Sequence, residues 1–301
     1  MATDQIQLDR IDTAASDTQR DIVAGVKTIL LHVQNDKALD QTLESALSLA
    51  RACDAHLDCL HVTPIQAYTS FDAFGGTFVM SEVIKSIDEE EKLLSERLSA
   101  KLRKEGVSWD YTQVTGDVAS QIIGRAALAD LVVTGRQPKR TAFQGPTIGL
   151  LGDLLHRSRT PLFIAADDGK LPDPNGRVLI AWNGSFEAAN AVRSAVGLLR
   201  LASEVRVVRI DEQKDETFPS TRLLEYLSRQ GINADLKVEV ADPMPLDTDF
   251  AYACLMSEAE RMEAGYVVMG GYGHSRVSEY MFGGLTRSVL GGCSVPLFIA
   301  H

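Results

Sequence analysis

ADLVVTGR at residues 129–136 has a counterpart in AGYVVMGG at residues 264–271. A second pair, TPLFIA (160–165) and VPLFIA (295–300), has the same offset of 135 residues. Equal offsets mean that the chain between the two anchors has the same length in both places, as expected of two copies of one structural unit. Each anchor contains a short apolar run, which is typical of a buried strand. The sequence therefore predicts two repeated domains.

A third pair of segments extends the repeat to the start of each half. KTILLHV (27–33) resembles RVLIAWN (177–183), with an offset of 150 that sets Val33 against Asn183. The segment DDGKLPDPNG is rich in Asp, Pro and Gly, as linkers are. The N-terminal residues lack the basic start and apolar core of a signal peptide, and we interpret them as a loose leader. The predicted organisation is a leader at 1–25, a first domain at 26–166, a linker at 167–176 and a second domain at 177–301.

Short apolar runs alternate with amphipathic stretches through both halves. The run TILLHV (28–33) is followed by a stretch that places Leu39, Leu43 and Leu47 on one helical face. The longest amphipathic stretch, at 81–106, predicts a long charged helix. Five strands alternating with helices in each half favour a mostly parallel sheet with helices on both faces, so we expect an α/β fold of two tandem, open, five-stranded sheets. In such sheets ligands bind beyond the carboxyl ends of the strands.

The bulk composition limits the partners. The chain has 301 residues and a formal net charge of −11, so most of its surface should repel nucleic acid and anionic membranes. No apolar run approaches the roughly 20 residues that span a bilayer. The four cysteines are too few for a disulfide framework, which favours a reducing cytoplasm.

The glycine-rich stretch MGGYGHSRVSEYMFGGLTRSVL (269–290) follows the apolar run YVV and is the main candidate site. Glycines allow sharp turns and close approach of a ligand to the backbone. The last glycines precede a predicted helix, whose first N–H groups lack partners and favour a phosphate. Neither a Walker loop nor the dinucleotide fingerprint is present, and the alternative is a connection whose glycines serve turns only. The candidate residues in this stretch are Gly270, Gly273, His274, Gly283, Gly284 and Thr286.

On these segments the chain resembles a tandem universal stress protein, with one copy of that domain in each half. The resemblance implies the adenine-nucleotide alpha-hydrolase-like fold and pairing of the fifth strands about a pseudo-two-fold axis. Members of the family that hold ATP carry G-x2-G-x9-G-(S/T) after the fourth strand, and Gly270, Gly273 and Gly283 match the three glycines. The hydroxyl position of that pattern falls on Gly284 in this chain.

Nucleotide-binding members also carry an Asp at the end of the first strand, close to the ribose or base, where this chain has Asn183. The first half departs further from the pattern, because Pro138 and Ile148 stand where the second half has Gly273 and Gly283. Pro138 has no N–H to offer, and Ile148 places a branched side chain where phosphate would lie. We therefore expect any nucleotide in the second domain alone.

CDAHLDCLH (53–61) offers Cys53, His56, Cys59 and His61, the residue types of a metal site. We expect Cys53 to end a helix, His56 to lie in a turn, and Cys59 and His61 to share one face of a buried strand. A metal site would need all four to converge across that turn, so we predict none. His274 is a candidate base or phosphate ligand in the glycine stretch, but no Ser-His-Asp or Cys-His arrangement predicts catalysis.

The resemblance implies a non-enzymatic, adenine-nucleotide-binding or signalling module in a stress response, with ATP or AMP in the second domain and the need for Mg²⁺ left open. One alternative is an interaction or structural stress protein that binds no nucleotide. Another is a slow ATP hydrolase that uses the loop from His274 to Arg287. For partners we expect a homodimer of the tandem chain, with no nucleic acid and no membrane.

Overall fold

The computed structural model describes residues 25–64, 77–136, 149–166, 169–211, 218–240, 248–271 and 284–301. Within these ranges no helix has both the length and the apolar character needed to cross a bilayer. All statements below concern these parts of the chain.

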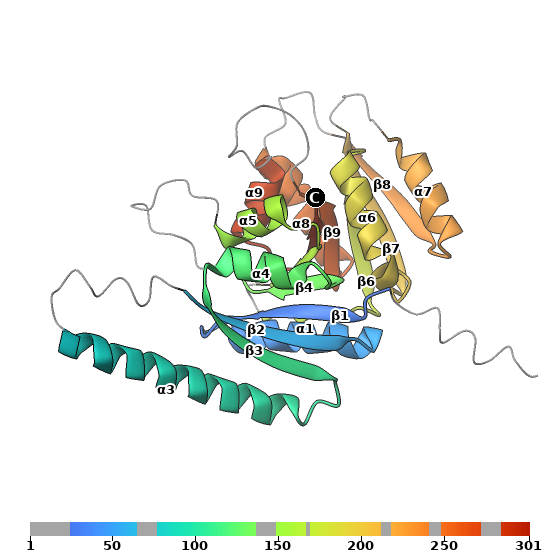
Figure 1. The fold of residues 1–301 in the computed structure, drawn as a ribbon. Coiled ribbons are helices and arrows are strands. Elements are labelled where there is room, and N and C mark those ends of the chain that lie inside the picture. Colours follow the sequence, from blue (N-terminus) through green and yellow to red (C-terminus); the bar gives the residue numbers. More distant parts are fainter. Residues whose placement is uncertain are drawn as a thin grey trace, which may run out of the picture.

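Strands and helices alternate through both halves (Figure 1). The first half contains β1 (Thr28–Val33), α1 (Leu39–Cys53), β2 (His56–Pro64), α3 (Thr77–Leu102), β3 (Trp109–Gly116), α4 (Val118–Ala126), β4 (Leu131–Thr134), α5 (Leu150–Arg157) and β5 (Leu162–Ile164). The second half contains β6 (Arg177–Trp182), α6 (Phe186–Leu199), β7 (Glu204–Asp211), α7 (Ser220–Arg229), β8 (Ala234–Val240), α8 (Thr248–Arg261), β9 (Tyr266–Gly270), α9 (Gly284–Gly291) and β10 (Leu297–Ala300). The predicted α/β class with a mostly parallel sheet is confirmed.

The two five-stranded halves join into one ten-stranded sheet, in the order β3-β2-β1-β4-β5-β10-β9-β6-β7-β8. Every strand pair is parallel except β5 with β10, which is antiparallel. At that junction Phe163 lies opposite Phe298, and these residues are equivalent at the offset of 135. The strand order reads the same from both edges of the sheet, so the halves are related by a pseudo-two-fold axis. The expected pairing through the fifth strands is confirmed.

Side-chain hydrogen bonds repeat the same symmetry. Gln41 of α1 donates to the carbonyl of Ala166, just after β5, at 2.5 Å. Asn190 of α6 donates to the carbonyl of His301, just after β10, at 2.6 Å. In each half the first helix thus holds the chain that leaves the fifth strand.

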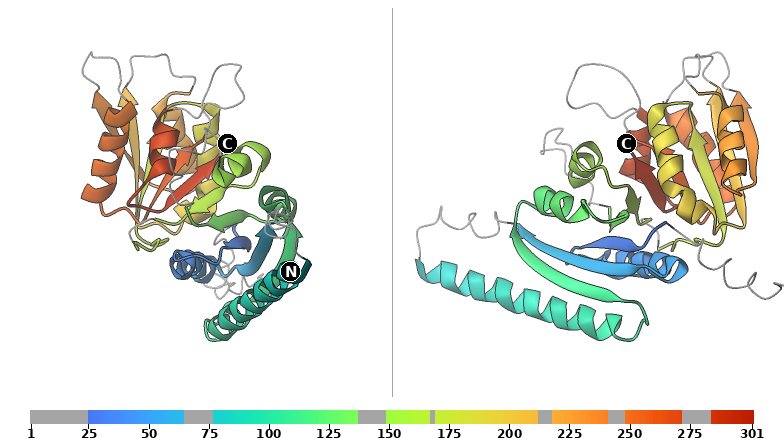
Figure 2. Two further views of the ribbon diagram at one scale, coloured as in Figure 1. Left: turned by 90° about the vertical axis from the view of Figure 1, so that its left-hand side faces the viewer. Right: turned by 45° about the vertical axis from the view of Figure 1, so that its right-hand side comes forward.

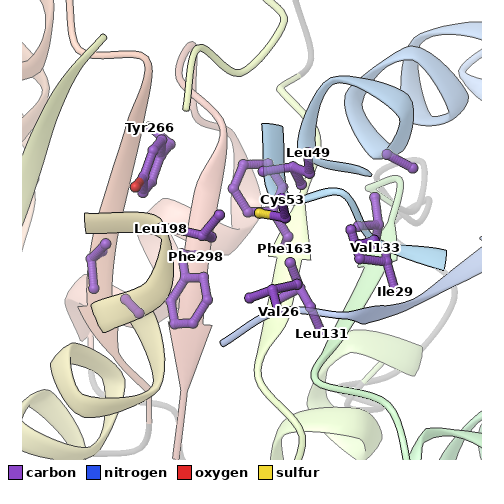
Figure 3. Packing of buried hydrophobic residues seen from close by; sticks show 14 of the residues in the cluster. Val26, Ile29, Leu49, Cys53, Leu131, Val133, Phe163, Leu198, Tyr266 and Phe298 are labelled. Carbon is purple, nitrogen blue, oxygen red and sulfur yellow. The ribbon is translucent and has the colours of Figure 1, made fainter. Parts of the chain in front are cut away.

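Helices cover both faces of the sheet, and each face has its own apolar core. One core contains side chains from α1, α3, α6 and α7, and the other contains side chains from α4, α5, α8 and α9. Figure 2 shows the long α3 beside β3 on the outer side of the first half. Figure 3 shows the first core at the junction of the halves, where the rings of Phe163 and Tyr266 are tilted at 58° with centroids 5.9 Å apart. The two halves therefore share a continuous core as well as a sheet.

The register of the sheet corrects the sequence alignment of the first strands. Ile29 lies opposite Leu131, and Val178 lies opposite Tyr266. Residues 131 and 266 are 135 apart, so residues 29 and 178, which are 149 apart, are equivalent. The predicted offset of 150 is wrong by one residue, and the counterpart of Asn183 is Gln34 rather than Val33. The sequence could not decide between the offsets of 149 and 150, because a short run of apolar residues fits both. The register is set by pairing with the neighbouring strand.

Two local predictions also differ from the structure. His56 is the first residue of β2 rather than a turn residue, because the turn is completed at Asp54, which has a positive φ of 49°. The long helix α3 begins at Thr77 and ends at Leu102, four residues earlier at both ends than predicted. It stops before Gly106, whose φ of 65° suits the turn into β3.

Candidate functional site

The second half has a reversal of strand order between β6 and β9. From β6 the chain moves outward to β7 and β8, then crosses back to β9 on the other side of β6. The helix after β6 packs on one face and the helix after β9 packs on the other. Open α/β sheets bind ligands outside the carboxyl ends of their strands at such a reversal of strand order. Asn183 follows β6 at this point, and Gly270 ends β9.

Asn183 begins a tight turn that leads into α6. Its side-chain Oδ1 accepts a hydrogen bond from the backbone N of Ser185 at 3.2 Å. Between them Gly184 adopts a φ of 68°, which a residue with a Cβ rarely adopts. The Oγ of Ser185 then caps the helix by accepting from the N of Ala188 at 3.1 Å. Asn183 is exposed at the edge of the sheet, with its oxygen used in the turn.

Gly270 has a packing role that the sequence did not reveal. A Cβ added to this residue would lie 2.4 Å from the N of Ala188 and 2.5 Å from the carbonyl carbon of Glu187. These are backbone atoms in the first turn of α6, so they cannot move aside as a flexible side chain would. The sequence predicts that this glycine admits a ligand, but the space that its missing Cβ leaves is filled by α6. The predicted ligand contact of Gly270 remains a prediction.

Helix α9 presents its N-terminus at the same edge and begins at Gly284. Its first turn contains no acidic side chain that would offset the positive end of the helix dipole. The equivalent helix α5 of the first half carries Asp153 in its first turn. The two helix ends therefore differ in charge, and the one in the second half suits an anion better. Thr286 lies in the first turn of α9 and is buried, and the predicted contact of its hydroxyl with a ligand remains a prediction.

Three other predicted site residues, Gly273, His274 and Gly283, lie outside the described residues. Pro138 and Ile148 in the first half lie outside them as well. The described part of the site therefore brings together Asn183 and Gly270 on neighbouring strands. The roles of the loop residues stay as predicted from the sequence.

Two aromatic side chains beside the site were missed at the level of sequence. The rings of Phe186, at the start of α6, and Phe218, just before α7, form an edge-to-face pair with centroids 4.8 Å apart. The backbone N of Phe218 also donates to the carbonyl of Gly184 at 3.1 Å, which ties the two helix starts together. The sequence feature that could have revealed this pair is a phenylalanine next to the cap residue of each helix. Phe186 stands in NGSFEA and Phe218 in ETFPST.

The cysteines and histidines of 53–61 do not form a metal site. Within the described ranges no group of three or more His, Cys, Asp or Glu side chains could hold a metal ion. Burial raises the pKa of Cys53 to about 11 and that of Cys59 to about 12, as expected of cysteines packed in a core. The ring of His61 bonds through Nδ1 to the carbonyl of Val33 at 3.0 Å, and Nδ1 of His56 lies 2.8 Å from the hydroxyl of Ser108.

Comparisons with known proteins agree with this architecture. Residues 25–164 match the model of the universal stress protein family. In structure the chain is similar to a universal stress protein from Archaeoglobus fulgidus DSM 4304, with a TM-score of 0.68 and 18% identity over 92% of this chain and 98% of that one. It is also similar to a putative universal stress protein from Pseudomonas aeruginosa UCBPP-PA14, with a TM-score of 0.56 and 15% identity over 92% of this chain and 93% of that one. At these identities the similarity concerns the fold alone. No curated protein sequence matches the chain.

Proposed function

We propose that the chain is a tandem member of the universal stress protein family, whose model matches its first domain at residues 25–164, and that its second domain binds an adenine nucleotide. ATP or AMP is the proposed ligand, and occupancy changes how the protein contacts its partners in a stress response. The first domain keeps the fold and has lost the site. All four cysteines are free, which fits the reducing cytoplasm that we propose as its location.

The observation that carries this proposal is the position of Asn183 and Gly270 at the strand-order reversal of the second half. Ala181 lies opposite Met269 in the sheet, so the residues that follow them leave the two strands side by side at the carboxyl edge. An amide there can donate to and accept from ribose hydroxyls or a base edge. The N-terminus of α9, free of acidic side chains in its first turn, favours a phosphate near the same edge.

We propose binding without turnover. Asn183 is an amide and does not exchange protons near neutral pH, and helix N–H groups stabilise a phosphate without activating water. His274 is the titratable group among the predicted site residues, and sequence spacing identifies no carboxylate partner for it. The site therefore has the chemistry of recognition.

The test is to identify small molecules released by denaturing the freshly purified protein, and then to titrate the emptied protein with ATP, ADP and AMP in a calorimeter. We expect one adenine-nucleotide site per chain. If none of the three nucleotides binds, the better explanation is that the protein acts as an interaction or structural protein. Binding at two equivalent sites per chain would contradict the proposal that the first domain has lost its nucleotide site. Steady-state release of phosphate from ATP would instead support the slow hydrolase.

A further inference from the structure

A small apolar cavity lies between α6 and α7, on the face of the second half away from α9. Its volume is about 160 Å³, close to the roughly 150 Å³ of an engineered apolar cavity that holds benzene. Val192 and Ala189 of α6 line one wall, and Leu223 and Tyr226 of α7 line the other. The space is therefore the size of one aromatic ring.

Trp182, the last residue of β6, also lines this cavity with its indole ring. The side chain is 4% exposed, and its Nε1 is buried without a hydrogen-bond partner among the described residues. A buried donor without a partner is costly and uncommon in folded proteins. Because this nitrogen is buried, a ligand in the cavity would contact the indole ring rather than the N–H.

Two arginines lie at the same cavity. Arg193 of α6 and Arg222 of α7 are both exposed and both line it. Among the described residues neither guanidinium forms an ion pair with a carboxylate. In a chain with a net charge of −11, two such arginines beside one apolar pocket indicate an anion.

The described part of the first half differs at the equivalent place in two ways. The residue equivalent to Trp182 at the offset of 149 is Val33, which has no polar atom in its side chain. The helix equivalent to α7 is the long α3, which packs Leu94, Leu98 and Leu102 into the core with 3% exposure or less. The lining of the cavity is thus specific to the second half and does not follow from the shared fold.

We propose that the cavity between α6 and α7 is a binding site for a small aromatic carboxylate. The ring fills the apolar space against the indole of Trp182, and the carboxylate lies between Arg193 and Arg222, which neutralise its charge. The site adjoins the nucleotide site, because Trp182 precedes Asn183 and Phe218 lines the cavity, but it lies under α6 and α7, whereas α9 covers the other face of the sheet. The proposal of an aromatic carboxylate site does not depend on whether a nucleotide binds.

Benzoate is a suitable probe, and the indole N–H signals of the two tryptophans report on it in a ¹H–¹⁵N correlation spectrum. We expect the signal of Trp182, assigned by its absence in Trp182→Phe, to shift progressively with benzoate while that of Trp109 stays in place. Benzyl alcohol, which lacks the charge, and acetate, which lacks the ring, should bind at least about tenfold more weakly, a difference of one charged or apolar contact. An unmoved Trp182 signal at millimolar benzoate would overturn the proposal.

Variants locate the site without relying on Trp182. Arg193→Gln with Arg222→Gln should weaken benzoate binding by about tenfold or more, as loss of charge-assisted bonds predicts. Arg229→Gln, an exposed arginine at the end of α7 that is paired with Glu225, is the matched control and should bind as the parent does. Ala189→Leu, which places a larger side chain at the half-buried wall, should abolish benzoate binding and leave any ATP binding unchanged. Equal benzoate affinity in the parent, the double arginine variant and Ala189→Leu would refute the assignment, whatever the outcome with ATP.

Discussion

Arg136, two residues after β4 in the first half, donates a hydrogen bond of 2.6 Å to the carbonyl of Val289 near the C-terminal end of α9 in the second half. The same Nη1 lies 3.1 Å from the carbonyl of Leu290. Carbonyls at a helix C-terminus lack internal partners and carry partial negative charge, so a buried guanidinium there is favourable on both counts. The symmetry-equivalent residue is Gly271, which has no side chain, so this link between the halves exists once.

Arg136→Ala should therefore weaken the junction of the two halves. Hydrogen bonds to charged groups are worth about 1.5–3 kcal/mol, and we expect a loss of that size in the free energy of unfolding. Urea denaturation followed by circular dichroism measures it. Arg200→Ala removes an exposed arginine that bonds Gln230 within the second half, and it should cost less than about 1 kcal/mol. Equal stability of the two variants would show that the junction does not depend on Arg136.

Gly270→Ala should destabilise the second half because the added Cβ would overlap the backbone of α6. Overpacking against atoms that cannot move aside costs about 1–3 kcal/mol. Gly124→Ala is the matched control, since nothing lies within 4 Å of the added Cβ in the exposed middle of α4. That change should instead stabilise the protein by about 0.5–1 kcal/mol, because alanine is the better helix former. Thermal unfolding of both variants checks the two signs, and a neutral Gly270→Ala would contradict the packing role.

Glu258 of α8 should make the protein sensitive to acid. A hydrogen bond from Arg261, aided by those from Lys237 and Arg206, lowers the pKa of this buried carboxyl from 4.5 to about 2. A lowered pKa in the folded state gives stability that is present above pH 4.5 and is lost as the pH falls toward about 2. The contribution should be of order 1–3 kcal/mol.

The measurement is urea unfolding of the parent and Glu258→Gln from neutral pH to about pH 2. The stability difference between them should be largest near neutral pH and should shrink below pH 4.5. Burial, together with the nearby His61, also lowers the pKa of His32, to about 4, but that histidine is present in both proteins and cancels in the comparison. A difference that does not change with pH would argue against an ionised Glu258 in the fold.

Asn183→Asp together with Gly284→Ser should strengthen ATP binding, because it restores the two positions where the chain departs from the family pattern. The introduced carboxylate keeps an oxygen that can accept from the backbone N of Ser185, so the turn into α6 should survive. Serine is favourable at the start of α9. New contacts of about 0.5–1.5 kcal/mol each, more when charged, predict a gain of roughly tenfold or more.

Calorimetric titration with ATP and with adenosine separates the two changes. The serine should favour ATP over adenosine, and the aspartate should help both alike. Gln34→Asp, the equivalent change in the first domain, is the control and should leave the affinity for ATP unchanged. A double variant that binds ATP no better than the parent would mean that the edge at Asn183 is shaped for another ligand.

The sequence by itself determined the repeat and the elements within it. The paired anchors around 131 and 266 and around 162 and 297 gave the correct offset of 135, because the strands there are apolar and unbroken in both halves. Alternation of short apolar runs with amphipathic stretches then predicted the class of sheet, since period and length are local properties of the chain. The resemblance to a family added the pairing of the fifth strands.

Only the tertiary structure decided which residues are equivalent at the first strands and what fills the space around the site. The offset of 149 follows from hydrogen bonding between β1 and β4 and between β6 and β9, which are about a hundred residues apart in the chain. The packing role of Gly270 depends on the backbone of α6, and the cavity lined by Trp182 depends on how α6 lies against α7. Contacts between distant segments carry no local pattern, so a single sequence predicts the elements better than the spaces between them.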